Sequence, residues 1–213
     1  KRLDAFGAAL LKEEDDSITS VTPLRQSLAV TRVDSNYALD LLVAFKRDAT
    51  KLRYENFDEL LDYCRYSAAP VGRYLLDLHD VPKSAWEAND ALCTALQILN
   101  HIQDCSDDYA EMDRVYIPLD LMADYGADVT HLSREHEACS PELRLTLQAL
   151  LNLTEPLVEK AKTFPPQIAD RKLRVNTSII VVIAEKLLKL LRQRDPLRDN
   201  VKLSKWDKIA AVI

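Results

Sequence analysis

One segment of this 213-residue chain combines side chains whose types and spacing suit metal chemistry. It reads Asn100-x-x-x-Asp104-x-x-x-Asp108, within a sequence that predicts a helix. Residues four apart share one helical face, so the amide and the two carboxylates would point the same way. Aligned like charges destabilise a helix by roughly 0.2–0.5 kcal/mol, whereas Mg²⁺ takes oxygen ligands from one or two carboxylates together with substrate phosphates. The motif therefore predicts a site for a metal ion and a diphosphate.

The alternative is that these polar residues belong to an ordinary solvent-exposed helix face. The preceding segment 91–99 is almost entirely apolar, which indicates that the helix carrying the motif is buried. Charged groups at the end of a buried helix need a partner. This context favours the metal site, while the exposed-face interpretation remains open from the sequence.

The composition favours an all-α protein. The chain has only three glycines, is 47% hydrophobic, and carries many Leu, Ala, Glu, Lys and Arg residues at helical spacing. The chain has no uninterrupted run of 18 apolar residues, so no membrane-spanning helix is expected. The four scattered cysteines are expected to be reduced, buried thiols of a cytoplasmic protein, without zinc spacing.

The net charge and the spacing of the histidines argue against a nucleic-acid-binding surface and against a metal site made of histidines. A formal net charge of −6 argues against nucleic-acid binding, which depends on basic patches. The four histidines show no metal-binding spacing among themselves. His101 lies one turn from Asp104, but a structural or surface histidine is the favoured interpretation.

Helical periodicity and capping residues outline the elements. Asp34, Asn56 or Asp58, and the capping box Ser84-x-x-Glu87 are expected to begin helices. Lys1 already lies within a helical pattern, so the chain is expected to begin inside a longer protein. The expected helices cover 1–12, 23–31, 34–51, 56–76, 84–112, 141–163, 171–194 and 204–213, with short elements at 118–128 and 131–136.

Two irregular segments are expected to matter for a site. Pro70 and Gly72 interrupt a helical pattern at a cost of about 3 and 1 kcal/mol, which predicts a kink or a break between two helices. This break is either a simple turn or an opening for a ligand. The segment 114–118 follows the acidic motif and is expected to be extended up to Pro118.

These motifs together resemble the squalene/phytoene synthase family of head-to-head prenyltransferases. The resemblance rests on the acidic motif, the segment 63–72 (YCRYSAAPVG) and Arg114-x-Tyr116-x-Pro118, and it extends over nearly the whole chain. Further motifs are most similar to the hydroxysqualene synthase branch of hopanoid biosynthesis: Asp48-x-x-x-x-Arg53-Tyr54, 76–79 (LDLH), 92–97 (LCTALQ) and 194–197 (RDPL).

The resemblance implies a single isoprenoid-synthase domain over 1–213, an all-α bundle around a central cavity. It implies that Asn100, Asp104 and Asp108 bind Mg²⁺, with Mn²⁺ as the alternative ion, and that Tyr63 faces the reacting carbons beside the catalytic Asp104 and Asp108. The substrate-binding residues that it implies are Arg53, Tyr66, Gln97, Arg114 and Tyr116.

The implied reaction is ionisation of presqualene diphosphate, rearrangement of the cation and capture by water to give hydroxysqualene. The alternatives are condensation of two prenyl diphosphates, or an inactive family member that acts as a helical assembly factor. No G-x-G-x-x-G follows a predicted strand, so no nicotinamide cofactor is expected. A cytoplasmic protein with peripheral membrane contact for its lipophilic product is expected, and the sequence leaves the oligomeric state open.

One family feature is missing. The family carries two Asp-rich motifs on facing helices, and the first would precede Lys1. The acidic run 13–16 is not a substitute, because four consecutive residues point around a helix and not along one face. We therefore expect this chain to lack the N-terminal part of the domain and to hold half of a metal site.

Overall fold

The structure, a computed structural model, describes residues 1–12, 18–199 and 201, and it confirms the all-α fold class. Within this part, the only extended pairing is an isolated parallel bridge between Arg53 and Val115. The helices are α1 (Arg2–Leu11), α2 (Val21–Thr31), α3 (Asn36–Asp48), α4 (Phe57–Ser67), α5 (Ala69–Leu78), α6 (Trp86–Gln103), α7 (Cys105–Met112), α8 (Leu119–Asp124), α9 (Pro141–Ala161) and α10 (Arg171–Gln193), with 3₁₀ turns η1 (Lys83–Ala85), η2 (Val129–Leu132) and η3 (Pro165–Gln167).

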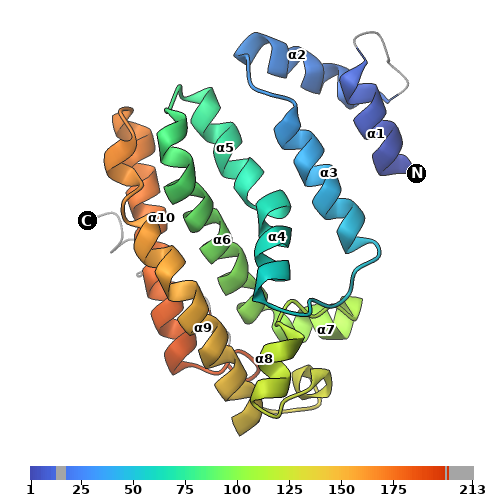
Figure 1. The fold of residues 1–213 in the computed structure, drawn as a ribbon, viewed down its shortest axis with the longest axis vertical. Coiled ribbons are helices and arrows are strands. Elements are labelled where there is room, and N and C mark those ends of the chain that lie inside the picture. Colours follow the sequence, from blue (N-terminus) through green and yellow to red (C-terminus); the bar gives the residue numbers. More distant parts are fainter. Residues whose placement is uncertain (13–17, 200, 202–213) are drawn as a thin grey trace.

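Helix α6 is the centre of the bundle (Figure 1). It packs against α9 and α10 on one side and against α4 and α5 on the other, and α3 lies beyond α4 and α5. Helices α1 and α2 pack together next to α3, whereas α7 and α8 lie at the end of the bundle where α3 and α6 finish. Residues from the ends of α3, α6 and the start of α4 therefore meet in one place.

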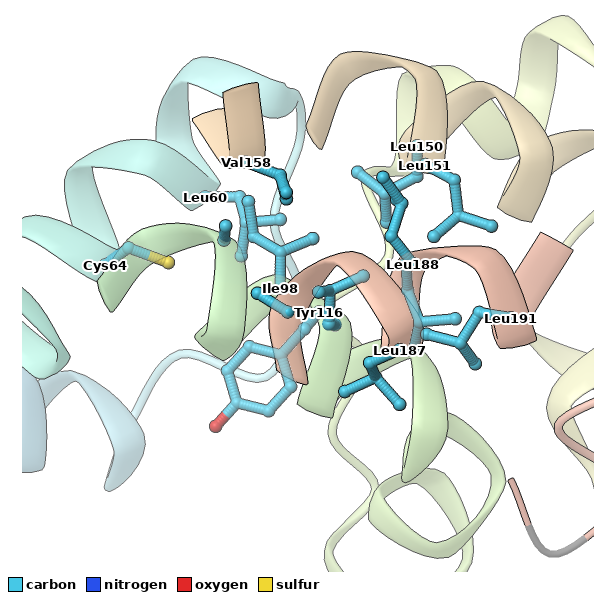
Figure 2. Packing of buried hydrophobic residues seen from close by; sticks show 14 of the residues in the cluster. Leu60, Cys64, Ile98, Tyr116, Leu150, Leu151, Val158, Leu187, Leu188 and Leu191 are labelled. Atoms are coloured by element: carbon cyan, nitrogen blue, oxygen red, sulfur yellow. The ribbon is translucent and has the colours of Figure 1, made fainter. Parts of the chain in front are cut away.

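Aliphatic side chains from α4, α6, α9 and α10 form the main core (Figure 2). Leu150 and Leu151 of α9 lie near Leu187 and Leu188 of α10, and all four are buried. Tyr116 lies at the edge of this group, with its hydroxyl pointing away from the leucines. The core thus has a polar rim at the end of the bundle.

The helix boundaries agree with most of the predicted ones, and capping explains several. The side chain of Asn56 accepts a hydrogen bond from the Glu59 amide at 2.9 Å, as expected for an N-cap. The capping box at Ser84 was wrong, because Ser84 lies inside turn η1 and α6 begins at Trp86 without a side-chain cap. Helix α3 begins at Asn36, whose amide donates to the Asp34 carboxylate at 2.9 Å.

The break predicted at Pro70 and Gly72 occurs two residues earlier. Ala68 separates α4 from α5, and Pro70 lies in the first turn of α5, where its missing N–H costs no helical hydrogen bond. Gly72 is helical and lets α5 approach α6. A Cβ there would lie 2.6 Å from the Cys93 Sγ and closer still to the Asn89 amide. The break is confirmed, but Gly72 serves helix packing and not the break.

Three further expectations concern particular segments. Within the described residues, no helix combines the length and apolar character needed to cross a membrane. All four cysteines are free, with Cys64 and Cys105 buried and the other two half-buried. The acidic run 13–16 and the helix expected at 204–213 lie outside the described residues.

Candidate active site

The acidic motif lies across a helix break. The single helix expected over 84–112 was wrong in this respect, because Asp104, with φ −100° and ψ 10°, separates α6 from α7. The helical hydrogen bonds nevertheless continue: the Asp104 amide donates to the Asn100 carbonyl at 2.9 Å, and the Asp108 amide donates to the Asp104 carbonyl at 2.8 Å. The spacing of four is therefore preserved through the break.

The burial of the motif differs from the expectation. Helix α6 is buried along most of its length, as predicted, but Asn100 and Asp104 at its end are exposed. Asp108 is half-buried, with a side chain 16% exposed. Because α6 emerges from the core at this end, the motif begins in solvent and turns inward at Asp108.

Three tyrosines form a buried cluster beside the motif. The ring centroids of Tyr54, Tyr63 and Tyr116 lie 5.3–5.5 Å apart. All three side chains are buried. The Val115 amide donates to the Leu52 carbonyl at 2.9 Å, so the segments carrying Tyr54 and Tyr116 run side by side. Helix α4 supplies Tyr63 to this group.

His101 connects the tyrosines to the acidic motif. Its ring stacks on Tyr116 with centroids 3.5 Å apart, and its Nδ1 lies 3.9 Å from the Asp108 carboxylate. Its Nε2 lies 3.0 Å from the Gln97 side-chain nitrogen, which donates to it. This contact leaves the ring proton on Nδ1, toward Asp108. Burial lowers the pKa of His101, and the nearby Asp108 opposes this effect only in part, so the ring is neutral at pH 7.

Asp48, the last residue of α3, is hydrogen-bonded to the tyrosine cluster. Its carboxylate accepts hydrogen bonds from the Tyr63 hydroxyl at 3.2 Å and the Tyr116 hydroxyl at 3.4 Å. Its carbonyl accepts from Arg114 at 2.7 Å, and Arg114 also donates to the Tyr116 hydroxyl at 3.2 Å. Asp48 is not among the site residues expected from the sequence. The available signal was its place in the motif with Arg53 and Tyr54.

Burial sets the protonation of the tyrosines. It is the main cause that raises the pKa of Tyr63, with hydrogen bonding to Tyr116 and the negative charge of Asp48 acting in the same direction. Burial likewise raises the pKa of Tyr54. These hydroxyls are therefore hydrogen-bond donors at any physiological pH, and their rings stay neutral.

Two of the expected substrate-binding residues lie outside this cluster. Arg53 forms an ion pair with Asp113 at 2.5 Å and lies over the Tyr109 ring of α7. Tyr66 lies beneath the guanidinium of Arg47, whose carbon is 4.7 Å from the ring centroid. The structure therefore brings Tyr63, Tyr116, Arg114, Gln97 and Asp108 together, and it leaves Arg53 and Tyr66 at separate positions.

The oxygen ligands that the motif offers are those of Asn100, Asp104 and Asp108. In the part of the chain that the structure describes, no three His, Cys, Asp or Glu residues are arranged to hold a metal ion. Asp104 lines a polar pocket of about 290 Å³ with Arg198 and Asp199 of the C-terminal segment. Two carboxylates and an amide fit the ligand set of a Mg²⁺ ion whose remaining positions belong to water and substrate phosphates.

Comparison with known protein sequences gives matches over most of the chain. The squalene/phytoene synthase family model matches residues 2–207. A hydroxysqualene synthase of Zymomonas mobilis subsp. mobilis is 44% identical over 193 residues, which are 90% of this chain and 64% of that protein. A hydroxysqualene synthase of Rhodopseudomonas palustris is 42% identical over 201 residues, 94% of this chain and 68% of that protein. The chain thus spans about two thirds of the length of these relatives.

Solved structures share the fold. A squalene synthase from Alicyclobacillus acidocaldarius superposes with a TM-score of 0.78 at 25% sequence identity, covering 90% of this chain and 72% of that one. A dehydrosqualene synthase in complex with ligand gives a TM-score of 0.83 at 24% identity, over 99% of this chain and 75% of that one. The second likeness shows the fold alone.

Proposed function

The chain belongs to the squalene/phytoene synthase family, and we propose that it converts presqualene diphosphate to hydroxysqualene. The C–O bond to diphosphate breaks, diphosphate leaves with the electron pair, and the cyclopropylcarbinyl cation rearranges. A water oxygen then bonds to the cation and loses a proton. The similarity to hydroxysqualene synthases over most of the chain supports this reaction among those of the family.

One observation carries the proposal: His101 joins the acidic motif to the tyrosine cluster. The acidic motif, which would assist diphosphate departure, and the tyrosine rings, which would face the cation, lie on either side of His101. Charge separation in this reaction needs both at short range. Aromatic faces stabilise a nearby cation by about 0.5–2 kcal/mol per favourable contact.

In this proposal Asn100, Asp104 and Asp108 would hold Mg²⁺, with Mn²⁺ as an alternative. When bound, the ion would neutralise the charge that grows on the diphosphate as the C–O bond breaks. Arg114 would contribute a fixed positive charge, since its guanidinium is held by the Asp48 carbonyl and Tyr116.

The tyrosine cluster would supply neutral rings and a water-poor surface. Tyr63 is buried among Tyr54 and Tyr116 and keeps its proton, so the cluster offers no phenolate to trap the cation prematurely. An apolar environment protects the intermediate until the intended water captures it. We assign Tyr63 to the face nearest the reacting carbons, and we retain Arg53, Tyr66 and Gln97 as more distant substrate contacts.

An exposed apolar face on α5 supports a lipophilic substrate. Val71, Leu75 and Leu78 are 51%, 44% and 40% exposed. Their spacing of four and three residues places them on one face of the helix. Exposed apolar stripes mark contacts with partner proteins, membranes or apolar ligands. A prenyl chain has the matching chemistry.

The experiment is product analysis with the complete gene product. Purified protein is incubated with presqualene diphosphate, with Mg²⁺ or with EDTA and without reductant, and the extract is analysed by mass spectrometry. Hydroxysqualene formed only with the metal supports the proposal. Conversion of farnesyl diphosphate to presqualene diphosphate, without hydroxysqualene, would assign the condensation reaction instead. Absence of turnover with both substrates would favour an inactive assembly factor.

The proposed partners follow from this chemistry. The substrate is a prenyl diphosphate, no nicotinamide cofactor takes part, and no nucleic acid is bound. We place the reaction in the cytoplasm, with peripheral membrane contact through which the lipophilic product leaves. Sedimentation of the protein with lipid vesicles in the presence of product tests this contact.

A further inference from the structure

Asp48 joins three separate segments at the candidate site. It is the last residue of α3, and its two carboxylate oxygens accept hydrogen bonds from Tyr63 of α4 and from Tyr116 of the extended segment after α7. Its carbonyl accepts a third bond from Arg114. These partners lie 15 to 68 residues away in the chain, so the contacts form only in the folded protein.

The basic residues closest to Asp48 in sequence are engaged with other acids. Arg47 pairs with Asp62 at 2.7 Å and Lys51 pairs with Glu59 at 2.8 Å. Arg114 contacts the Asp48 carbonyl and not its carboxylate. The two phenol hydroxyls are therefore the hydrogen-bond donors that the structure gives this carboxylate. A side chain needed only to end α3 would require neither contact.

These bonds fix the tyrosines. A phenol that donates to a carboxylate has its hydroxyl proton turned toward that carboxylate, and its ring can no longer rotate freely about the Cα–Cβ bond. Tyr63 also lies 3.5 Å, oxygen to oxygen, from the Tyr116 hydroxyl. Loss of the carboxylate would let the Tyr63 hydroxyl turn its proton toward the Tyr116 oxygen and leave the Tyr116 hydroxyl without this acceptor.

Building on the proposed function, we propose that Asp48 is a positioning residue for the reaction, because it holds the ring and hydroxyl of Tyr63 in the orientation used during cation rearrangement and water capture. It acts through Tyr63 and Tyr116 and does not touch the substrate. It is distinct from the acidic motif, since its contacts are phenols and not metal ligands.

The first test is kinetic and uses Asp48→Asn in the complete protein. Asn keeps the size of the side chain and the backbone carbonyl that binds Arg114, but it lacks the charge. We expect kcat with presqualene diphosphate to fall by about 10- to 100-fold, as for a misoriented reacting group. KM and the Mg²⁺ concentration at half-maximal rate should stay within about two-fold, because substrate and metal binding are not altered. The fraction of products other than hydroxysqualene should rise.

The matched control is Asp62→Asn. Asp62 precedes Tyr63 on α4 and is an exposed carboxylate paired with Arg47. Its loss removes the same charge close by without touching a phenol, so kinetics and products should equal those of the parent. The double variant Asp48→Asn with Tyr63→Phe should be no more than about three-fold slower than Tyr63→Phe alone, because residues that act as a unit are not additive.

The second test needs no turnover. Tyrosine labelled with ¹³C at Cζ reports the hydrogen bond of each phenol, and Tyr63→Phe and Tyr116→Phe assign the two signals. Asp48→Asn should shift both signals and leave that of exposed Tyr125 in place. Unchanged Tyr63 and Tyr116 signals would overturn the positioning role, whatever the enzyme's substrate proves to be.

The outcomes separate this inference from the proposed function. If the parent enzyme converts only farnesyl diphosphate, the proposed function fails while the spectroscopic test and the kinetic comparison on that substrate still decide the role of Asp48. If a folded Asp48→Asn variant has the kcat and products of the parent, the positioning role of Asp48 is refuted. If Asp48→Asn lowers the melting temperature so far that the protein does not fold, Asp48→Glu takes its place. The displaced carboxylate of Asp48→Glu should shift both tyrosine signals and lower kcat. Signals and kcat equal to those of the parent would refute the positioning role of Asp48.

Discussion

The imidazole of His101 lies parallel to the ring of Tyr116, with an interplanar angle of 17° and centroids 3.5 Å apart. His101 follows Asn100 in the last turn of α6, and Tyr116 belongs to the extended segment after α7. This stack links the acidic motif and the tyrosine cluster through the buried, neutral ring of His101. A change in the last turn of α6 would therefore move the tyrosine cluster as well as the acidic motif.

Replacing Asp104 with Ala in the complete protein should abolish Mg²⁺-dependent turnover while leaving stability almost unchanged. The side chain is exposed at the break between α6 and α7 and makes no capping hydrogen bond there. The interactions of an exposed charged side chain contribute little to stability, so the free energy of unfolding should change by less than about 1 kcal/mol. Turnover and urea unfolding measure the two effects.

Asp107→Ala is the control for that prediction. Asp107 is an exposed residue in the first turn of α7, close to Asp104 in sequence, and it pairs with Arg134 at 2.7 Å and not with the tyrosine cluster. Turnover of this variant should match the parent. A large loss of thermal stability in Asp104→Ala without metal would instead identify Asp104 as a structural partner.

Gly72→Ala should destabilise the protein by about 1–3 kcal/mol, the usual cost of an overpacked helix contact. The added Cβ would meet the Cys93 Sγ and the Asn89 amide of α6, and Asn89 is only 3% exposed. Chemical unfolding measures the loss. Gly7→Ala is the matched control, because its Cβ would meet only the ends of two leucine side chains, the closest at 3.2 Å. Equal stabilities of the two variants would show that α5 can move away from α6.

Stability should fall at alkaline pH because of the tyrosine cluster. The pKa of Tyr63 is raised above its unfolded value, so its contribution is complete below about pH 10 and is lost as pH rises further. The loss amounts to about 1.4 kcal/mol per pH unit above 10 for each such tyrosine. Urea unfolding between pH 8 and 11 measures it. The free energy of unfolding of Tyr63→Phe should fall less over this pH range than that of the parent. Equal changes with pH in the two proteins would contradict the prediction.

The buried thiols should be unreactive in the native protein. Burial raises the pKa of Cys64 and of Cys105 to about 12, so neither forms the thiolate that attacks disulfide reagents. At pH 8 an aromatic disulfide reagent should leave both unmodified, and in denaturant all four cysteines should react. Asp62→Cys provides an exposed thiol for calibration. Rapid native modification of Cys64, located by mass spectrometry, would show that α4 opens locally.

The sequence alone determined the class of the protein, most helices and the acidic motif. These features are local: helical periodicity, the Asn56 cap and a spacing of four between Asn100, Asp104 and Asp108 depend on neighbours within a few turns. The same locality explains why the motif's spacing survives the break in the helix at Asp104.

Tertiary structure decided which polar groups meet. Asp48, Tyr63 and Tyr116 are far apart in the chain, and their hydrogen bonds exist only because the end of α3 and the start of α4 lie at the same side of the bundle as the extended segment after α7. No periodicity encodes such contacts, since they depend on how whole helices pack. For the same reason Gly72, read from its propensity as a helix breaker, proved to be the point where α5 touches α6.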